Sequence, residues 1–383
     1  MEKLGTPISC NQFFLTGHSL FCIFLDMKAS SYHLSHMNRV SRTKFFSVVF
    51  LFCLMSVFVL AAILEGALRF GIIENEQYYR WQTPKKTKYR LLILGDSFII
   101  PRSALAKSLA RDLVAQNVSV LNAAISGTGP FEYLAEMKAM GMNFKPDVVL
   151  LSYYVGNDLT NVQNHPQFNP KKTGVAIDSR TSQSFGRSLY LYHYVLRNLR
   201  MARLRLRSFD YEKAEASGIS PELIEDAKKL RINPWLVNLA LEETNYFLDN
   251  LLMETDDNMK SWEKAKQLLA DIHDLCNSLH SQMMVVIFPG SIQVNDSHFE
   301  FYKKLTFNLD GRTLESTKPQ RLLMDFCAGR NIACLDLSPA FKARKEEEFY
   351  QDKDDHLNEK GSHVAGQLIL DFLLRNSIIG KDK

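Results

Sequence analysis

One segment limits what this chain can fold into: residues 45–64, FFSVVFLFCLMSVFVLAAIL, contain 20 residues and no charged side chain. A helix of about 20 apolar residues spans the hydrocarbon core of a bilayer. The apolar part of a secretory signal is shorter, roughly 7–15 residues. We therefore expect a retained transmembrane anchor. A signal cleaved near Ala61-Ala62 and a buried core helix are the alternatives.

The charges on either side of this apolar run predict its orientation. They are Arg39, Arg42 and Lys44 before the run, and Glu65, Arg69, Glu74 and Glu76 after it. Positive charge is retained on the cytoplasmic side, so residues 65–383 are expected across the membrane, with 65–88 as a connector. Residues 1–44 are expected to be disordered or partly mis-started, with translation beginning at Met37 or Met27.

The composition is that of a globular protein, with 46% hydrophobic and 23% charged residues. The formal net charge is only +4, and basic residues alternate with acidic ones. This pattern lacks the basic face of a nucleic-acid binder, so no nucleic-acid partner is expected. The six cysteines have no metal-binding spacing, and we expect neither metal nor cofactor. Buried free thiols are favoured over a Cys327–Cys334 bridge.

Strand and helix patterns alternate from residue 89 onward. The predicted strands are 89–94, 118–121, 147–154, 283–288 and 332–335, and the predicted helices are 104–116, 131–140, 259–280, 318–329 and 359–375. Strands separated by helices favour a parallel sheet with right-handed crossovers. The strand at 147–154 is nearly all apolar, which is typical of a strand covered on both faces.

A long, mostly helical insertion is predicted at residues 160–257, within a domain at 89–378. Insertions near the carboxyl edge of a sheet commonly shape a binding site or a lid. Its stretch 187–207 contains six arginines among leucines and tyrosines. A packed helix with solvated arginines is the favoured interpretation, and a surface for anionic lipids or an acidic polymer is the alternative.

The first chemical motif is Gly95-Asp96-Ser97, which closes the apolar strand 89–94. A turn at that point presents a serine hydroxyl beyond the carboxyl end of the sheet, where open α/β folds keep their sites. Asp96 is assigned to shaping the turn. The tripeptide alone is ordinary turn chemistry, so its meaning depends on the rest of the chain.

Three later segments supply what a serine nucleophile needs. Gly127 follows the second strand, where a glycine lets backbone N–H groups approach a ligand. Asn157 follows the third strand, and its amide is a candidate oxyanion donor, a contribution of roughly 3–4 kcal/mol. His356 lies in an acidic loop before the last helix and is a candidate general base oriented by a carboxylate. Each segment taken alone is equally compatible with a plain turn.

The ordered blocks GDSF, SGTGPFEYL, KPDVVLLSYYVGNDL and DDHLNEKG resemble the SGNH (GDSL-type) hydrolase superfamily, in particular its bacterial membrane-anchored members. The resemblance covers residues 90–160 and 280–375. It implies a three-layer α/β/α fold of flavodoxin-like type with a mainly parallel five-stranded sheet. It also implies a serine hydrolase that acts on ester bonds, located in the bacterial inner membrane with its catalytic domain in the periplasm.

The resemblance assigns Ser97 as nucleophile, with the Ser97 and Gly127 N–H groups and the Asn157 side chain forming the oxyanion hole. His356 is then the general base. Many family members place an aspartate three residues before this histidine, where this chain has Lys353. Relatives that act on surface polysaccharides use D-x-H, which Asp354 satisfies. Asp354 is therefore the expected orienting acid, with Asp352 and Asp355 as lesser candidates, and a Ser–His dyad is a further possibility.

The expected function is hydrolysis of an acyl ester, such as a small ester, a lipid or an acylated glycan, through an acyl-enzyme on Ser97. The membrane partner is expected to be bound through residues 45–64. One alternative is an O-acyltransferase or deacetylase that acts on cell-envelope polysaccharide. A lesser alternative is a catalytically silent binding module of the envelope.

Overall fold

The computed structural model describes residues 39–70, 72–73, 81–82, 87–170, 191–192, 194–195, 199 and 211–380. Contacts divide the chain into two units, residues 1–66 and 67–383. Residues 1–38 of the segment 1–44 lie outside the described residues, as does most of the arginine-rich stretch 187–207.

The first described element is the long apolar helix α2 (Arg39–Arg69). Its part Phe45–Arg69 is long and apolar enough to cross a membrane, which makes it a candidate membrane span or signal sequence. The side chains of residues 45–60 are exposed, as 70% for Phe50 and 71% for Phe52 illustrate. A core helix gains about 1.5–3 kcal/mol for each large apolar side chain that it buries. α2 therefore lacks the burial of the core-helix alternative, and it extends past the predicted end at Leu64.

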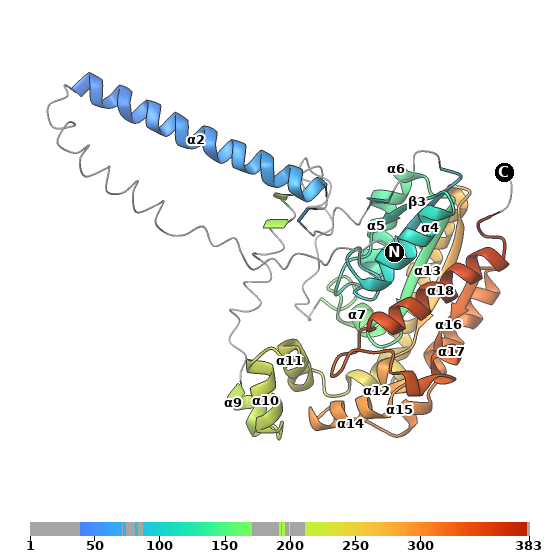
Figure 1. Cartoon of the computed structure of the whole chain (residues 1–383). Helices are drawn as coiled ribbons and strands as arrows, with labels where there is room; N and C mark the ends of the chain where they lie inside the picture. The colour runs from blue at the N-terminus through green and yellow to red at the C-terminus, as the bar shows by residue number, and fades with distance from the viewer. Residues whose placement is uncertain are drawn as a thin grey trace, which may run out of the picture. The chain divides into compact units, whose positions relative to one another are not determined.

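Five parallel strands form the sheet of the larger unit (Figure 1). They are β2 (Tyr89–Leu94), β3 (Val118–Asn122), β4 (Val148–Tyr154), β5 (Gln282–Phe288) and β6 (Ala333–Asp336). Their order is β3-β2-β4-β5-β6, and every neighbouring pair in it is parallel. The predicted five-stranded parallel sheet is thus confirmed. A short strand β1 (Trp81–Gln82), in the expected connector, adds an antiparallel edge beside β3.

Helices cover both faces of this sheet. They are α4 (Ala104–Ala115), α5 (Pro130–Glu136), α13 (Asp256–Ser278), α16 (Lys318–Gly329) and α18 (Glu359–Arg375). Successive side chains of a strand point to opposite faces. Leu91 and Ile93 accordingly join the core beneath α4 and α18, whereas Leu92 and Leu94 join the core beneath α5, α13 and α16. The three-layer α/β/α architecture is therefore confirmed.

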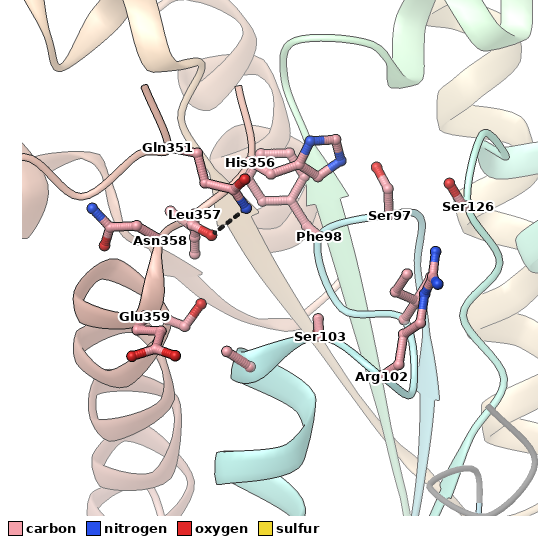
Figure 2. Close-up of a pocket in the computed structure, with 13 residues that line it drawn as sticks. Ser97, Phe98, Arg102, Ser103, Ser126, Gln351, His356, Leu357, Asn358 and Glu359 are labelled. Atoms are coloured by element: carbon pink, nitrogen blue, oxygen red, sulfur yellow. Dashed lines mark hydrogen bonds between the residues drawn. The ribbon is translucent and has the colours of Figure 1, made fainter. Parts of the chain in front are cut away.

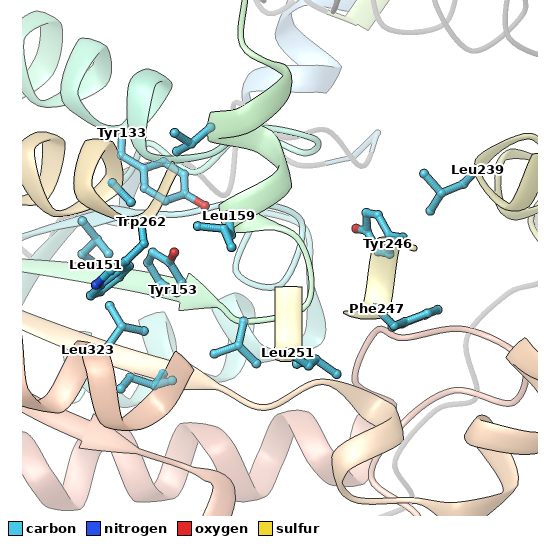
Figure 3. Close-up of a cluster of buried hydrophobic side chains, with 14 of the residues drawn as sticks. Tyr133, Leu151, Tyr153, Leu159, Leu239, Tyr246, Phe247, Leu251, Trp262 and Leu323 are labelled. Atoms are coloured by element: carbon cyan, nitrogen blue, oxygen red, sulfur yellow. The ribbon is translucent and has the colours of Figure 1, made fainter. Parts of the chain in front are cut away.

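The insertion contributes short helices to the second of these cores. These helices are α9 (Tyr211–Ala216), α10 (Pro221–Lys228), α11 (Pro234–Glu242) and α12 (Tyr246–Leu251). Figure 3 shows Leu239 of α11 and Tyr246 of α12 in the same cluster as Tyr153 of β4 and Trp262 of α13. Helices α9 to α12 of the insertion are thus packed into the domain core.

Shorter segments connect the remaining elements. They are η1 (Met137–Gly141), α6 (Met142–Phe144), α7 (Asp158–Asn164), η4 (Ser291–Gln293), α14 (Asp296–Lys304), α15 (Arg312–Glu315), α17 (Ser338–Lys342) and η5 (Lys345–Glu347). The thiols of Cys276 and Cys327 are buried and free, and that of Cys334 is half-buried and also free.

Candidate active site

Ser97 lies in the tight turn that follows β2. The turn passes so close to β4 that a Cβ at Gly95 would lie 2.8 Å from the Cβ of Ser152 and 2.8 Å from Cγ2 of Ile99, which favours glycine there. Asp96 is fully buried, and its Oδ1 accepts a hydrogen bond of 3.1 Å from the backbone N–H of Phe98. This bond fixes the turn and leaves Ser97 half-buried at the rim of a cavity of about 570 Å³.

His356 lines the same cavity from a loop that precedes α18 (Figure 2). The loop is closed at its base by the Tyr350–Leu357 bridge and by a 2.9 Å bond from the Gln351 N–H to the His356 carbonyl. The imidazole stacks on the ring of Phe98, with centroids 5.5 Å apart and planes 26° apart. Because Phe98 is the neighbour of Ser97, this stacking places the candidate base beside the candidate nucleophile.

Two carboxylates face the Nδ1 atom of His356. Asp354 Oδ1 lies 2.5 Å from Nδ1 and also accepts a 2.9 Å bond from the backbone N–H of His356. Asp355 Oδ1 lies 3.4 Å from Nδ1, and its other oxygen accepts a 3.0 Å bond from the Tyr154 hydroxyl. Asp352 is exposed and has no bond to His356 within the described residues. Asp354 thus has the geometry of an orienting acid, and Asp355 is a second carboxylate behind it.

These charges change the acid–base properties of the site. Burial lowers the pKa of His356, but the Asp354 bond and the negative charges of Asp355, Asp354 and Asp96 outweigh it and raise that pKa to about 9. Burial raises the pKa of Asp355 to about 6, although the imidazolium opposes this rise. The bond to the imidazole keeps the pKa of Asp354 below its usual value in spite of burial. With Nδ1 directed at carboxylates, Nε2 is the nitrogen left to exchange a proton with a hydroxyl.

Asn157 is joined to the serine turn by its side chain. It follows β4, and its Nδ2 donates a 3.0 Å bond to Asp96 Oδ2. An amide nitrogen carries two hydrogens, so one remains for a ligand after the bond to Asp96. The adjacent Gly156 leaves room for Tyr154, because a Cβ there would overlap the Tyr154 ring.

Gly127 reaches the site through the register of β2 and β3. The backbone N–H of Ile125 donates a 3.0 Å bond to the carbonyl of Gly95, so Gly127 and Ser97 each lie two residues beyond this pair. Gly127 has a φ of +73°, a left-handed conformation that glycine adopts without strain. Its neighbour Ser126 lines the cavity together with Ser97. The structure thus brings the four sequence blocks to one edge of the sheet.

The four blocks that resemble the SGNH hydrolase superfamily thus lie at one edge of a three-layer α/β/α domain. No protein-family model matches the sequence, and no curated protein matches it. Among solved structures, it is similar to a lipase/acylhydrolase from Enterococcus faecalis, with 14% identity, coverage of 75% of this chain and 96% of that chain, and a TM-score of 0.37. It is also similar to a catalytic mutant of an acetylxylan esterase from Geobacillus stearothermophilus, with 11% identity, coverage of 75% and 95%, and a TM-score of 0.39. A third is a proposed lipolytic protein of the G-D-S-L family from Desulfitobacterium hafniense, with 11% identity, coverage of 75% and 100%, and a TM-score of 0.37.

Sequence reasoning missed several residues that support this site. Asp96 was assigned only to the turn, but it also accepts the Asn157 amide. Tyr154 and Phe98 hold Asp355 and His356, and neither was named as a site residue. The available signal was position: Phe98 follows the nucleophile directly, and Tyr154 ends the strand that precedes Asn157.

A second buried carboxylate supports the loop that carries Asn157. Asp158 accepts a 2.7 Å bond from the Tyr133 hydroxyl and a 3.1 Å bond from the Tyr154 backbone N–H. Burial, and then the neighbouring charge of Asp96, raise the pKa of Asp158 well above its usual value. Asp158 therefore helps to fix the end of β4, one residue from the candidate oxyanion donor.

Asp354, Asp355 and His356 are also the kind of residues that bind metal ions, and their ligand atoms lie within 4.8 Å of one another. The His356 nitrogen that faces both carboxylates is Nδ1, and it is bonded to Oδ1 of Asp354. Nδ1 of His356 is thus already engaged by Asp354, as in an acid–base pair.

Proposed function

We propose that this chain is a serine esterase of SGNH type that hydrolyses acyl esters through an acyl-enzyme on Ser97. The observation that carries the proposal is that Ser97, Phe98 and His356 line one cavity, with Asp354 bonded to His356. A serine needs a base within reach and an orienting group behind that base. Asp354 on Nδ1 leaves Nε2 of His356 to act on the hydroxyl.

In the first half-reaction, Ser97 Oγ attacks the acyl carbon while Nε2 of His356 takes the hydroxyl proton. The oxyanion accepts hydrogen bonds from the backbone N–H groups of Ser97 and Gly127 and from the second Nδ2 hydrogen of Asn157. The imidazolium then protonates the leaving alcohol as the ester bond breaks. A water molecule, deprotonated by His356, releases the acid and restores Ser97.

The second candidate is acyl transfer to, or deacetylation of, a cell-envelope polysaccharide. The cavity favours it because polar residues outnumber apolar ones along its lining; they include Arg102, Ser103, Ser126, Gln351, Asn358 and Glu359. Such groups match the hydroxyls of a sugar better than the methylenes of a long acyl chain. The D-x-H spacing at Asp354 points the same way.

We also propose that the catalytic domain acts outside the cytoplasm of a bacterium, attached to the inner membrane by α2. The apolar stretch of this helix and the basic residues before it support that topology. A carbonate wash separates the possibilities: an anchored protein stays in the membrane pellet, whereas a chain cleaved near Ala62 appears in the soluble fraction.

The test uses the full-length chain in detergent, a fluorophosphonate probe and p-nitrophenyl esters of increasing chain length. We expect the wild type to be labelled and to turn over the acetate best, and the Ser97→Ala variant to do neither. Acetylated xylo-oligosaccharides with and without an acceptor sugar then separate hydrolysis from transfer. Unchanged turnover in Ser97→Ala would exclude the mechanism, and an unlabelled, inactive wild type would favour the silent module.

A further inference from the structure

The loop that carries Asp354 and His356 is bonded to the helical insertion. Lys353 Nζ lies 3.1 Å from Asp226 Oδ2 in α10, 127 residues away in the sequence. Lys353 occupies the position where many SGNH enzymes have their catalytic aspartate. In this chain the position therefore carries a positive charge that is paired with a carboxylate of the insertion.

The Lys353 bond adds a side-chain contact at the tip of the loop, where the Asp354 N–H also donates a 3.3 Å bond to the Gln351 carbonyl. At the base, the Asn358 N–H donates a 2.9 Å bond to the Phe349 carbonyl, in addition to the Tyr350–Leu357 bridge. At the tip, Lys353 has a φ of +56°, a left-handed conformation that is unfavourable for a residue with a side chain. A strained conformation persists where its surroundings hold it. Asp226 supplies one such contact at Lys353, in addition to the Tyr154 bond to Asp355 and the stacking of Phe98 on His356.

Helix α10 is a rigid support for this partner. Ser220 caps its first turn and Pro221 is its first residue, which are favourable choices at a helix start. Leu223, Ile224 and Ala227 are buried in the larger core cluster. Asp226 lies between these residues and is only 6% exposed. Its position is therefore set by the packing of the domain.

Asp226 has a second cationic partner that offers an internal comparison. Arg231 Nη1 lies 3.3 Å from Asp226 Oδ1, while Lys353 occupies the Oδ2 side. Both cations are bonded to the same carboxylate, but only Lys353 belongs to the loop with Asp354 and His356. The side chain of Arg231 is 59% exposed, so its removal leaves the core intact.

We propose that Asp226 and Lys353 are positioning residues, through which the insertion fixes the orienting acid and the general base opposite Ser97. This inference rests on the proposed esterase function and gives the insertion a role in that same site. Neither residue lines the cavity. Their effect therefore passes through the placement of Asp354, directly next to Lys353, and of His356.

The test compares Lys353→Met, Asp226→Asn, the double variant and Arg231→Met in the full-length chain, assayed with p-nitrophenyl acetate. A misplaced catalytic group commonly costs one to two orders of magnitude in rate. We expect kcat to fall about tenfold in Lys353→Met and Asp226→Asn, with KM within about twofold of the wild type. The double variant should lose about tenfold rather than a hundredfold, because both changes break one bond. Arg231→Met should keep kcat within about twofold.

A conservative replacement and a stability measurement complete the test. The kcat of Lys353→Arg should lie within about threefold of the wild-type value, since a guanidinium also bonds a carboxylate. Thermal melts should show no greater loss of stability in Lys353→Met than in Arg231→Met. Equal kcat losses in these two variants, additive losses in the double variant, or a kcat loss that only follows the melting temperature would overturn the inference. An inactive wild type would instead contradict the proposed function itself.

Discussion

Replacing Asp354 by asparagine is expected to move the pH dependence of the reaction to lower pH. The change keeps the shape of the side chain but removes the charge 2.5 Å from His356 Nδ1. That bond is the largest contribution that raises the pKa of His356 to about 9. Only the neutral imidazole accepts the serine proton. Wild-type kcat/KM should therefore rise with pH, and this rising limb of the profile should have an apparent pKa near 9. At pH 7 kcat/KM should reach about 1% of its plateau.

Without the Asp354 charge the neutral imidazole is favoured, so the limb should move toward 6.5, the ordinary pKa of histidine. With a limb at 6.5, kcat/KM at pH 7 is about three quarters of its own plateau. The plateau itself should fall, because an asparagine does not stabilise the imidazolium. We expect a loss of about a hundredfold, less than the ten-thousandfold known for a lone triad aspartate. The reason is that Asp355 keeps a second carboxylate 3.4 Å from Nδ1.

The assay follows p-nitrophenyl acetate between about pH 5 and 10 at a wavelength where product absorbance does not change with pH. This activated ester needs no protonation of its leaving group, so the limb reports the base alone. The rate with Ser97→Ala is subtracted as background. Asp355→Asn should shift the limb less than Asp354→Asn, and Asp352→Asn, at an exposed position without a bond to His356, is the matched control. A wild-type limb near 6.5, or equal shifts in the Asp354 and Asp352 variants, would refute the reasoning.

Three further outcomes follow from the contacts of the strand end at residues 154–157. Asn157→Ala should lower kcat by about 10²–10³ with little change in KM, as expected for one lost oxyanion donor; a raised KM with normal kcat would instead indicate a binding role. Tyr154→Phe removes the hydroxyl bonded to Asp355, so the pKa of Asp355 should rise further above about 6. Because Asp355 stays ionised near pH 9, the kcat/KM limb should remain near 9, and a limb displaced by a full pH unit would contradict this. Gly156→Ala would force a Cβ into the Tyr154 ring, and we expect a loss of about 1–3 kcal/mol in the free energy of unfolding by urea. An unchanged urea midpoint would show that the ring moves freely.

Much of the fold follows from local signals. Strand β2 and helices α16 and α18 begin and end where the sequence pattern predicts them. Helix α18 illustrates why, since Asn358 immediately before it accepts a bond from the Gly361 N–H and caps the first turn. The edge strand β1 has no such signal. Its two residues, Trp81 and Gln82, are strand only because they pair with β3.

The candidate site likewise contains residues that the sequence predicts and residues that it does not. Ser97, Gly127, Asn157 and His356 follow strands or precede a helix at the carboxyl edge of the sheet, so topology alone brings their segments together. The residues that bond the loop with Asp354 and His356 could not be predicted from topology. Tyr154 is 201 residues from Asp355, and their bond depends on side-chain directions that no local pattern encodes. Asp226 lies in an insertion that resembles nothing in the four blocks.

Several carboxylates lie close together near Ser97, and their hydrogen bonds account for this clustering. Each one bonds a particular donor: Asp96 bonds Asn157, Asp158 bonds Tyr133, and Asp355 bonds Tyr154. Buried carboxylates near one another raise each other's pKa and destabilise the ionised forms, so their retention calls for a compensating role. Here that role is orientation, because each bonded donor belongs to a different element. The turn, the strand end and the histidine loop are thereby fixed relative to one another before substrate binds. Their removal should therefore cost kcat more than KM.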